Sequence, residues 1–195
     1  MARFIKTVPR EQADVLAAEA EGLRELAAAN AVRIPKVLDS GVRGGEAYLE
    51  LEEIEAAPPT PASEALLGEQ LAAQHRVTKK AFGWHRDNTI GRTPQPNGWY
   101  DNWVEFYRGR RLRFQLELAA KKGFGSMLQA KGERLLEALP ALLADHSPQP
   151  SLLHGDLWGG NWLADRAGTP WIFDPAVYYG DREADLAMTH LFGGF

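Results

Sequence analysis

The segment SLLHGDLWGGNWLADRAGTPWIFDP, residues 151–175, gives the clearest indication of the fold. Short apolar runs at its start and near its end flank a polar loop and a turn rich in Gly and Asp. This pattern predicts a strand and a polar loop, followed by two strands joined by a turn. Because such a hairpin folds the chain back on itself, we expect Asp174, which follows the last strand, to lie beside the loop.

The loop carries His154, Asp156 and Asn161, which fit the H-x-D-x-x-x-x-N spacing of kinase catalytic loops. Phosphoryl transfer needs one carboxylate to orient and deprotonate the acceptor hydroxyl, and a second carboxylate and an amide oxygen to hold Mg²⁺. We assign Asp156 as the catalytic base, and Asn161 and Asp174 as the metal ligands. The alternatives are turn capping by these residues and a metal hydrolase, which the lack of HExxH or another close histidine pair disfavours.

An independent signal lies near the N-terminus, where Lys6 sits in the apolar run FIK. Glu19 is one helical turn from both Val15 and Leu23, so it falls on the apolar stripe of a helix predicted over 11–30. A carboxylate there is costly unless it is paired, and a lysine on a neighbouring strand would pair with it. Kinases place their ATP phosphates with such a pair. The alternative is a snorkelling lysine and a solvated glutamate.

The composition of the chain argues against several kinds of partner and site. The 195 residues carry a net charge of −4 without a basic block, which argues against nucleic acid as a partner. Cysteine is absent, which excludes disulfides and thiolate metal sites and fits a reducing cytoplasm. No apolar segment has the length of a signal or a membrane span, so we expect no membrane partner and a cytoplasmic location.

The Pro-rich segment 57–63 (APPTPAS) is typical of a connector. We therefore expect a small N-terminal lobe at 1–56 and a larger C-terminal lobe at 57–195. Outside the segments already described, periodicity predicts strands over 3–8 and 47–54, helices over 64–78, 101–122, 127–145 and from 183 onward, and a loop over 82–99.

Three segments resemble one family, the fructosamine/ketosamine-3-kinases, which are relatives of the aminoglycoside phosphotransferases. They are HGDLWGGN (154–161), FGWHRDNTIGRTPQPNGWYDNW (82–103, with RLRFQ at 111–115) and FDPAVYYGDREADLAMTHLFGGF (173–195). The first alone indicates only the kinase-like superfold, whereas the other two point to this family. The resemblance implies an α+β, two-lobed, protein-kinase-like fold, with a nucleotide-binding N-terminal lobe and a mainly helical C-terminal lobe that holds the catalytic-loop hairpin and the substrate.

By this resemblance the reaction is the phosphorylation, with ATP and Mg²⁺ as cofactors, of the sugar 3-hydroxyl of ketosamines. Ketosamines are the Amadori adducts, such as fructosamines and ribulosamines, that form when sugars glycate amines or proteins, so the activity is a deglycating repair. Lys6 would contact the ATP phosphates and Glu19 would brace it. The backbone of Glu52, Glu53 and Ile54 would meet adenine as the hinge.

The resemblance also implies roles in the larger lobe. Trp158 would stack on the sugar, with a place in the core as the alternative. His154 would support the loop through hydrogen bonds and Asp185 would anchor it as a structural residue. The polar residues of DNTIG (87–91) and PQPN (94–97) would line the acceptor pocket or form turns.

The sequence departs from the family at both ends. Family members carry strands and a glycine-rich loop before the FIK strand, and helices beyond LFGGF. We therefore expect a chain truncated at both ends, with an incomplete small lobe and little or no activity. The alternatives are an inactive nucleotide-binding remnant and a phosphotransferase for an aminoglycoside or choline, which TPQPN argues against. No feature of the sequence bears on the oligomeric state.

Overall fold

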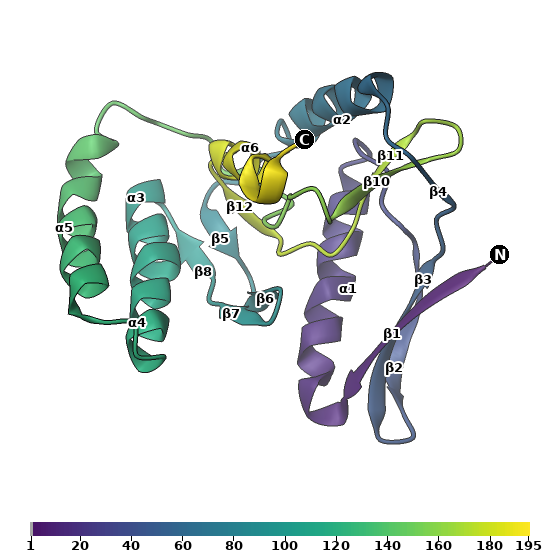
Figure 1. Cartoon of the computed structure of the whole chain (residues 1–195), viewed down its shortest axis with the longest axis horizontal. Coiled ribbons are helices and arrows are strands. Elements are labelled where there is room, and N and C mark those ends of the chain that lie inside the picture. The colour runs from purple at the N-terminus through teal and green to yellow at the C-terminus, as the bar shows by residue number, and fades with distance from the viewer. Residues whose placement is uncertain (1) are drawn as a thin grey trace.

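A three-stranded antiparallel sheet forms one end of the molecule, with its strands in the order β1-β3-β2 (Figure 1). The computed structural model describes residues 2–195 of the chain. The strands of this sheet are β1 (Arg3–Pro9), β2 (Val37–Arg43) and β3 (Glu46–Glu52). Burial alternates along β3, as expected for a sheet with one covered and one open face. The strands predicted over 3–8 and 47–54 are confirmed.

Helix α1 (Ala13–Ala28) packs against this sheet and runs along it toward the centre of the molecule (Figure 1). Its apolar stripe includes Leu23 and Leu26, which are fully buried. The chain leaves the helix through Asn30 at a φ of 50°, a left-handed conformation that Asn tolerates better than most residues. The helix predicted over 11–30 is therefore confirmed, and the sheet and helix together bring β1 and α1 to one side of the site described below.

The rest of the chain forms a larger group of helices and short antiparallel sheets. Its helices are α2 (Pro61–Gln74), α3 (Trp103–Phe106), the π-helical turn η2 (Tyr107–Arg113), α4 (Phe114–Lys121), α5 (Ser126–Leu142) and α6 (Glu183–Thr189). Two 3₁₀ turns, η1 (Arg10–Gln12) and η3 (Leu191–Gly193), precede α1 and follow α6. Separate helices and antiparallel sheets make this an α+β protein, as predicted.

The short strands of this group fall into three sheets with the orders β8-β5-β12-β9, β11-β10-β4 and β6-β7. They are β4 (Ala56–Ala57), β5 (Phe82–Trp84), β6 (Asn88–Ile90), β7 (Thr93–Gln95), β8 (Gly98–Tyr100), β9 (Ser151–Leu153), β10 (Trp162–Asp165), β11 (Pro170–Ile172) and β12 (Tyr178–Gly180). The loop predicted over 82–99 is wrong, because β5 to β8 lie there. Strands of three residues are too short to show a period of two.

The predicted connector at 57–63 contains the end of a strand and the start of a helix. β4 pairs with β10, so it belongs to the sheets of the larger group. The hydroxyl of Thr60 accepts the N–H of Ser63, and the hydroxyl of Ser63 accepts the N–H of Thr60, which together form a capping box for α2. A lobe boundary between residues 56 and 57 would fall inside β4, and the division at that point stays a prediction.

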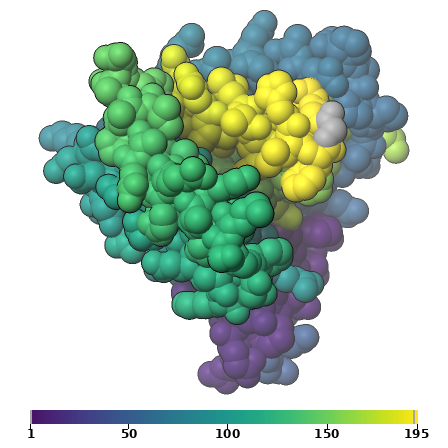
Figure 2. All heavy atoms as spheres, turned by 60° about the vertical axis from the view of Figure 1, so that its left-hand side comes forward, coloured from purple at the N-terminus to yellow at the C-terminus, as the bar shows by residue number. Residues whose placement is uncertain are grey.

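The C-terminal residues lie on the surface between α5 and α2 in the view of Figure 2, where they are yellow, green and blue respectively. Large apolar side chains are exposed on α5 and near the C-terminus, among them Met127, Leu142 and Phe192. Within residues 2–195, none of the helices combines the length and the apolar character that crossing a bilayer requires.

Candidate active site

The hairpin β10–β11 places Asp174 beside the catalytic loop, as the sequence predicts. Trp162 pairs with Ile172 at the base of the hairpin. The backbone N–H of Phe173 then donates to the carbonyl of Asn161 at 3.1 Å, and the side-chain amide of Asn161 lies 3.5 Å from the carbonyl of Asp174. Asp174 has a φ of 56°, a left-handed conformation that turns the chain sharply after the strand.

His154 and Asp185 hold the loop from behind. The carboxylate of Asp185, which is 1% exposed, accepts the backbone N–H groups of His154 (2.9 Å) and Gly155 (2.8 Å). It also accepts Nε2–H of His75 at 3.0 Å. All three donors are buried, so the carboxylate replaces the water that these groups would otherwise bind. Asp185 therefore makes the contacts that its predicted anchoring role requires, and the role itself stays a prediction.

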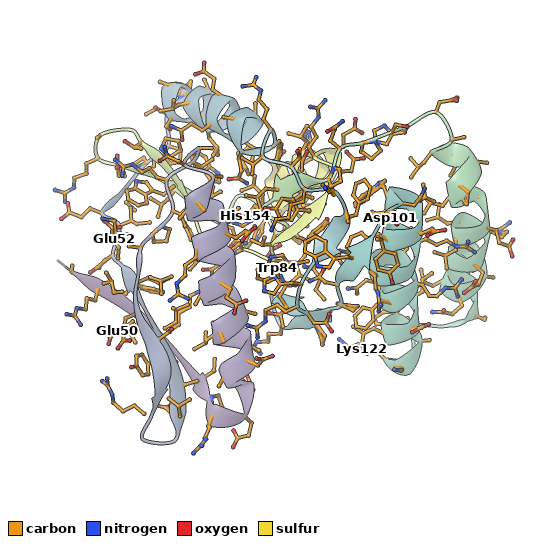
Figure 3. All side chains as sticks on the ribbon, turned by 180° about the vertical axis from the view of Figure 1, so that it is seen from behind. Glu50, Glu52, Trp84, Asp101, Lys122 and His154 are labelled. Atoms are coloured by element: carbon orange, nitrogen blue, oxygen red, sulfur yellow. The ribbon has the colours of Figure 1, made fainter. Side chains whose placement is uncertain are left out.

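The ring of His154 joins the two chain segments that carry the acidic side chains. Its Nε2 lies 2.9 Å from the carbonyl of Phe173 and its Nδ1 lies 3.3 Å from the backbone N–H of Asp156. These partners require a proton on Nε2 and a free lone pair on Nδ1, which is a neutral imidazole. Complete burial lowers the pKa of His154 as well. Figure 3 shows this side chain in the middle of the molecule, well away from the solvent-exposed ends.

Gly155 is required by the close approach of the loop to the following segment. It has a φ of 82°, and a Cβ built on it would lie 2.1 Å from the carbonyl oxygen of Ala176. The N–H of Ala176 in turn donates to the carbonyl of His154 at 2.9 Å. A side chain at position 155 would push these two backbones apart, and with them Asp156 and Asp174.

Asp156 and Asn161 meet across the mouth of the loop. The side-chain amide of Asn161 donates to the backbone carbonyl of Asp156 at 2.7 Å and to its Oδ2 at 3.1 Å. Burial raises the pKa of Asp156 to about 6, against the opposing effect of the bond from Asn161. The carboxylate is therefore ionised at neutral pH and is more basic than an exposed aspartate, which suits proton acceptance.

Lys6 reaches the same place from β1. Its Nζ donates to Glu19 Oε1 on α1 at 2.7 Å, so the predicted strand–helix pair is present. The same Nζ lies 2.5 Å from Asp174 Oδ1, a contact that sequence reasoning missed. Burial lowers the pKa of Lys6, but the two carboxylates outweigh it and raise the pKa above its ordinary value. Burial raises the pKa of Glu19, against the opposing effect of Lys6.

The side chains of the site carry an excess of negative charge that a cation would balance. Three carboxylates, those of Glu19, Asp156 and Asp174, line one cavity together with the ammonium of Lys6, which contacts Glu19 and Asp174. The amide of Asn161 points its Nδ2 at Asp156, which leaves its carbonyl oxygen available. Carboxylate and amide oxygens are hard donors of the kind that Mg²⁺ prefers. The excess negative charge and the oxygen ligands therefore fit the predicted magnesium site.

One cavity of about 340 Å³ collects these side chains. It is lined by Lys6, Glu19, Asp156, Trp158, Asn161 and Asp174, among others. Trp158 is half-buried, and its ring packs edge-on against Phe192 with 5.4 Å between centroids. Gly160 permits this placement, since a Cβ there would lie 2.2 Å from the indole. The indole thus lines the cavity and is not in the core.

A second, more apolar cavity of about 220 Å³ shares Asp174 with the first. All three predicted hinge residues, Glu52, Glu53 and Ile54, line it. Its apolar side chains are Phe4, Pro35, Leu51, Leu163 and Phe173. In Figure 3, Glu52 lies at the end of β3 that is level with His154. The apolar cavity thus lies next to the charged cavity at Asp174, an arrangement that suits a nucleotide.

Two contacts of the site had no signal in the sequence. Lys6 and Asp174 are 168 residues apart, and His75 and Asp185 are 110 residues apart. Neither His75 nor Leu163, which lines the apolar cavity, belongs to a motif. The local spacing of the loop and the apolar stripe of α1 could reveal only the partners that sit on one element or on adjacent ones.

Comparison with known proteins identifies the relatives of the chain. A family model described as fructosamine kinase matches residues 1–195. A probable ketoamine kinase of Synechocystis sp. is 44% identical over 193 residues, which are 98% of this chain and 64% of the relative. A Haemophilus somnus protein solved under the name fructosamine-3-kinase superposes with a TM-score of 0.90 at 31% identity, over 99% of this chain and 64% of that one.

A more distant structure supports the fold alone. An aminoglycoside-3′-phosphotransferase of type VIII superposes with a TM-score of 0.52 at 22% identity, over 95% of this chain and 67% of that one. The predicted phosphotransferase-like, protein-kinase-like fold is thereby confirmed. The chain spans about two thirds of the length of the relatives it matches, 64% in the Synechocystis protein. Since the family model covers the chain from end to end, the chain belongs to the fructosamine kinase family.

Proposed function

We propose that the chain carries the catalytic centre of an ATP-dependent kinase that phosphorylates the 3-hydroxyl of the sugar in ketosamines. The observation that carries this proposal is that Asp156, Asn161, Asp174 and Lys6 line one cavity, and that Asp174 also lines a second, more apolar cavity. The names of the relatives, ketoamine kinase and fructosamine-3-kinase, support the acceptor and the position of transfer. The cytoplasmic location stays a prediction.

Asp156 orients the acceptor hydroxyl and takes its proton. Its pKa of about 6 leaves the carboxylate ionised at pH 7 while keeping it basic enough to accept a proton as the new bond forms. Asn161 holds the carboxylate through Oδ2, and the neutral ring of His154 holds the backbone N–H of Asp156. The base is thus fixed from two sides before the substrate arrives.

Lys6 contacts the phosphates of ATP, and Glu19 keeps the ammonium in place. Asn161 and Asp174 would hold Mg²⁺, which neutralises charge on the transferring phosphoryl group when it is bound. Asp174 would give up part of its contact with Lys6 to hold the metal. Asp156 would act on the acceptor hydroxyl.

The nucleobase and the sugar take the two ends of the paired cavities. Phe4, Leu51 and residues 52–54 line the apolar cavity and would hold the adenine there. Within that backbone, the N–H of Glu53 already donates to the carbonyl of Ala2 at 3.3 Å, so Ile54 offers the freer hinge position. The sugar lies at the other end, where the indole of Trp158 lines the charged cavity.

An assay of acceptor-dependent phosphate transfer tests the function. The chain is incubated with Mg²⁺, γ-labelled ATP and ribulosyl-lysine, fructosyl-lysine, an aminoglycoside or choline, with the full-length Synechocystis relative in parallel. We expect transfer to the ketosamines alone, with phosphorus NMR placing the phosphate on O3. Transfer to the aminoglycoside or choline, or ADP formation independent of any acceptor, would overturn the proposal.

The Asp156→Asn variant tests the base. We expect turnover to fall by roughly 10²–10⁴, the usual contribution of a positioned general base, with Mg·ATP binding nearly unchanged. Asp174→Asn should instead weaken Mg·ATP binding, because a metal ligand is lost. The control is Asp145→Asn at an exposed position far from the cavity. Turnover by Asp156→Asn within a few-fold of wild type would remove Asp156 from this role.

A further inference from the structure

The hairpin β6–β7 forms the wall of the charged cavity on the acceptor side. Asn88, Thr89 and Gly91, all on this hairpin, line the cavity together with Trp158. The hairpin belongs to neither of the larger sheets, since β6 and β7 pair only with each other among the described strands. Something other than sheet pairing must therefore fix its position relative to the catalytic loop.

Two side-chain amides make that connection. The Nε2 of Gln95, a residue only 4% exposed, lies 2.9 Å from the carbonyl of Ala176 and 2.9 Å from Oδ1 of Asn88. The Nδ2 of Asn88 donates to the carbonyl of Val177 at 2.9 Å. These bonds link residues 81 and 89 positions apart, so the amides are not merely forming turns.

A second layer holds the amides themselves. Asn97 is 1% exposed, and its Nδ2 donates to Oδ1 of Asn88 at 3.1 Å and to the carbonyl of Arg86 at 3.0 Å. Its own Oδ1 accepts from Arg111 at 2.8 Å. The guanidinium of Arg111 lies over the ring of Tyr178, 4.2 Å from its centroid. The hairpin is thus joined to η2 through hydrogen bonds, and η2 is joined to β12 through the cation–π contact of Arg111 with Tyr178.

The segment that receives these bonds follows the proposed metal ligand. Ala176 and Val177 are two and three residues beyond Asp174, whose left-handed backbone conformation needs support from its surroundings. Ala176 is held on its other side by the carbonyl of His154. The same short segment is therefore fixed by the catalytic loop through its N–H and by the acceptor-side hairpin through its carbonyl.

We propose that Gln95 is a positioning residue that couples the acceptor wall to Asp174. Together with the amide of Asn88, its amide group sets the hairpin against the backbone that carries the proposed metal ligand, so that the two substrates are placed relative to each other. The acceptor half of this inference rests on the function proposed above. The half that concerns Asp174 rests only on its proposed role as a metal ligand, and it can be tested by Mg·nucleotide binding in the absence of any acceptor.

The Gln95→Glu variant tests the coupling with little change of shape. It removes both N–H donors and sets a carboxylate against the carbonyl of Ala176 and Oδ1 of Asn88. We expect the Kd for Mg·ADP, measured by calorimetry without acceptor, to rise about 10- to 100-fold, the usual effect of losing a group that orients a metal ligand. The KM for ribulosyl-lysine should rise as well, whereas a purely structural role would lower the folded fraction and leave both constants unchanged.

The matched control is Gln129→Glu, because Gln129 also donates its amide to a backbone carbonyl, that of Leu116, but on α5. It should leave both constants unchanged. If Gln95→Glu does not fold, Asn88→Ser buries no charge and should still weaken Mg·ADP binding several-fold. Wild-type affinity for Mg·ADP in whichever of the two variants folds would overturn the inference, as would a wild-type chain that does not bind Mg·ADP. Failure of ketosamine transfer alone would count only against the proposed function.

Discussion

The two sides of the site are held in place by different forces. Asp156 stands on a loop whose backbone donors bind a buried carboxylate, and the ring of His154 behind it has no exposed surface. Lys6 stands on β1, where its neighbours Phe4 and Ile5 are 51% and 53% exposed. Two carboxylates from other elements hold its ammonium.

The difference matches what each side has to do. Proton acceptance depends on a fixed geometry, which buried and fully satisfied hydrogen bonds provide. In the proposed function the lysine side would meet phosphates and a metal, and the ion pair between Lys6 and Asp174 could be exchanged for those ligands without breaking the core. We infer that the loop side is fixed before binding, and that the β1 side is adjusted by it.

The largest expected loss of stability comes from removing the buried carboxylate that supports the loop. Asp185→Ala deprives three buried N–H groups, two of the backbone and one of His75, of their acceptor. At about 1–3 kcal/mol for each unsatisfied group, the free energy of unfolding should fall by at least about 3 kcal/mol. For a chain of this size, that lowers Tm by roughly 6–12 °C.

The control for this variant is Asp145→Ala, which truncates an exposed aspartate and should shift stability by less than about 0.5 kcal/mol. Urea unfolding followed by tryptophan fluorescence measures both. If Asp185→Ala were as stable as the control, the loop would not depend on this carboxylate, and the contrast between the two sides of the site would disappear.

A double-mutant cycle on Lys6 and Glu19 measures the other side. The side chains are 21% and 16% exposed, so removal of one leaves the other poorly solvated. Lys6→Met and Glu19→Gln should therefore be non-additive in the free energy of unfolding, with a coupling of about 1–3 kcal/mol. The matched pair on the same sheet is Arg3 and Glu50, which should couple by less than about 1 kcal/mol because the Arg3 side chain is 62% exposed.

If the effects of Lys6→Met and Glu19→Gln on the free energy of unfolding were additive, the ion pair would contribute no stability, even though its atoms lie close together. A coupling as large as the loss in Asp185→Ala would contradict the comparison from the opposite direction. In that case the ion pair on β1 would hold the site as firmly as the buried support of the loop, and Lys6 could not readily exchange Asp174 for phosphates.

The sequence revealed those parts of the site whose residues share a local pattern. Asp156 and Asn161 lie on one loop, and Asp174 follows the hairpin that leaves it, so their spacing alone predicted the cluster. Glu19 was conspicuous because a carboxylate on the apolar stripe of a helix needs a partner, and Lys6 on the adjacent sheet supplies it. Both inferences rest on short-range geometry that regular elements impose.

The parts that the sequence did not reveal depend on tertiary packing. The strands between residues 82 and 100 are too short for a periodic signal, and β5 pairs with a strand near the end of the chain. The amides of Gln95 and Asn97 look like turn formers, yet Gln95 bonds to the carbonyl of Ala176. A polar residue in a Gly- and Pro-rich segment gives no indication of which distant carbonyl it will reach.

The smallest expected change in the free energy of unfolding concerns a second Asp–His pair, near the surface. His146 Nε2 lies 2.5 Å from Asp181, four residues before Asp185, and the His146 side chain is 34% exposed. The bond to Asp181 raises the pKa of His146, so the pair stabilises the protein below the ordinary histidine pKa and loses this effect as pH rises through the folded-state value. In urea unfolding, His146→Gln should therefore destabilise the chain most near pH 5.5, by less than about 1 kcal/mol given the exposure, and hardly at all at pH 9. A difference that grows with pH would mean that His146 acts in its neutral form.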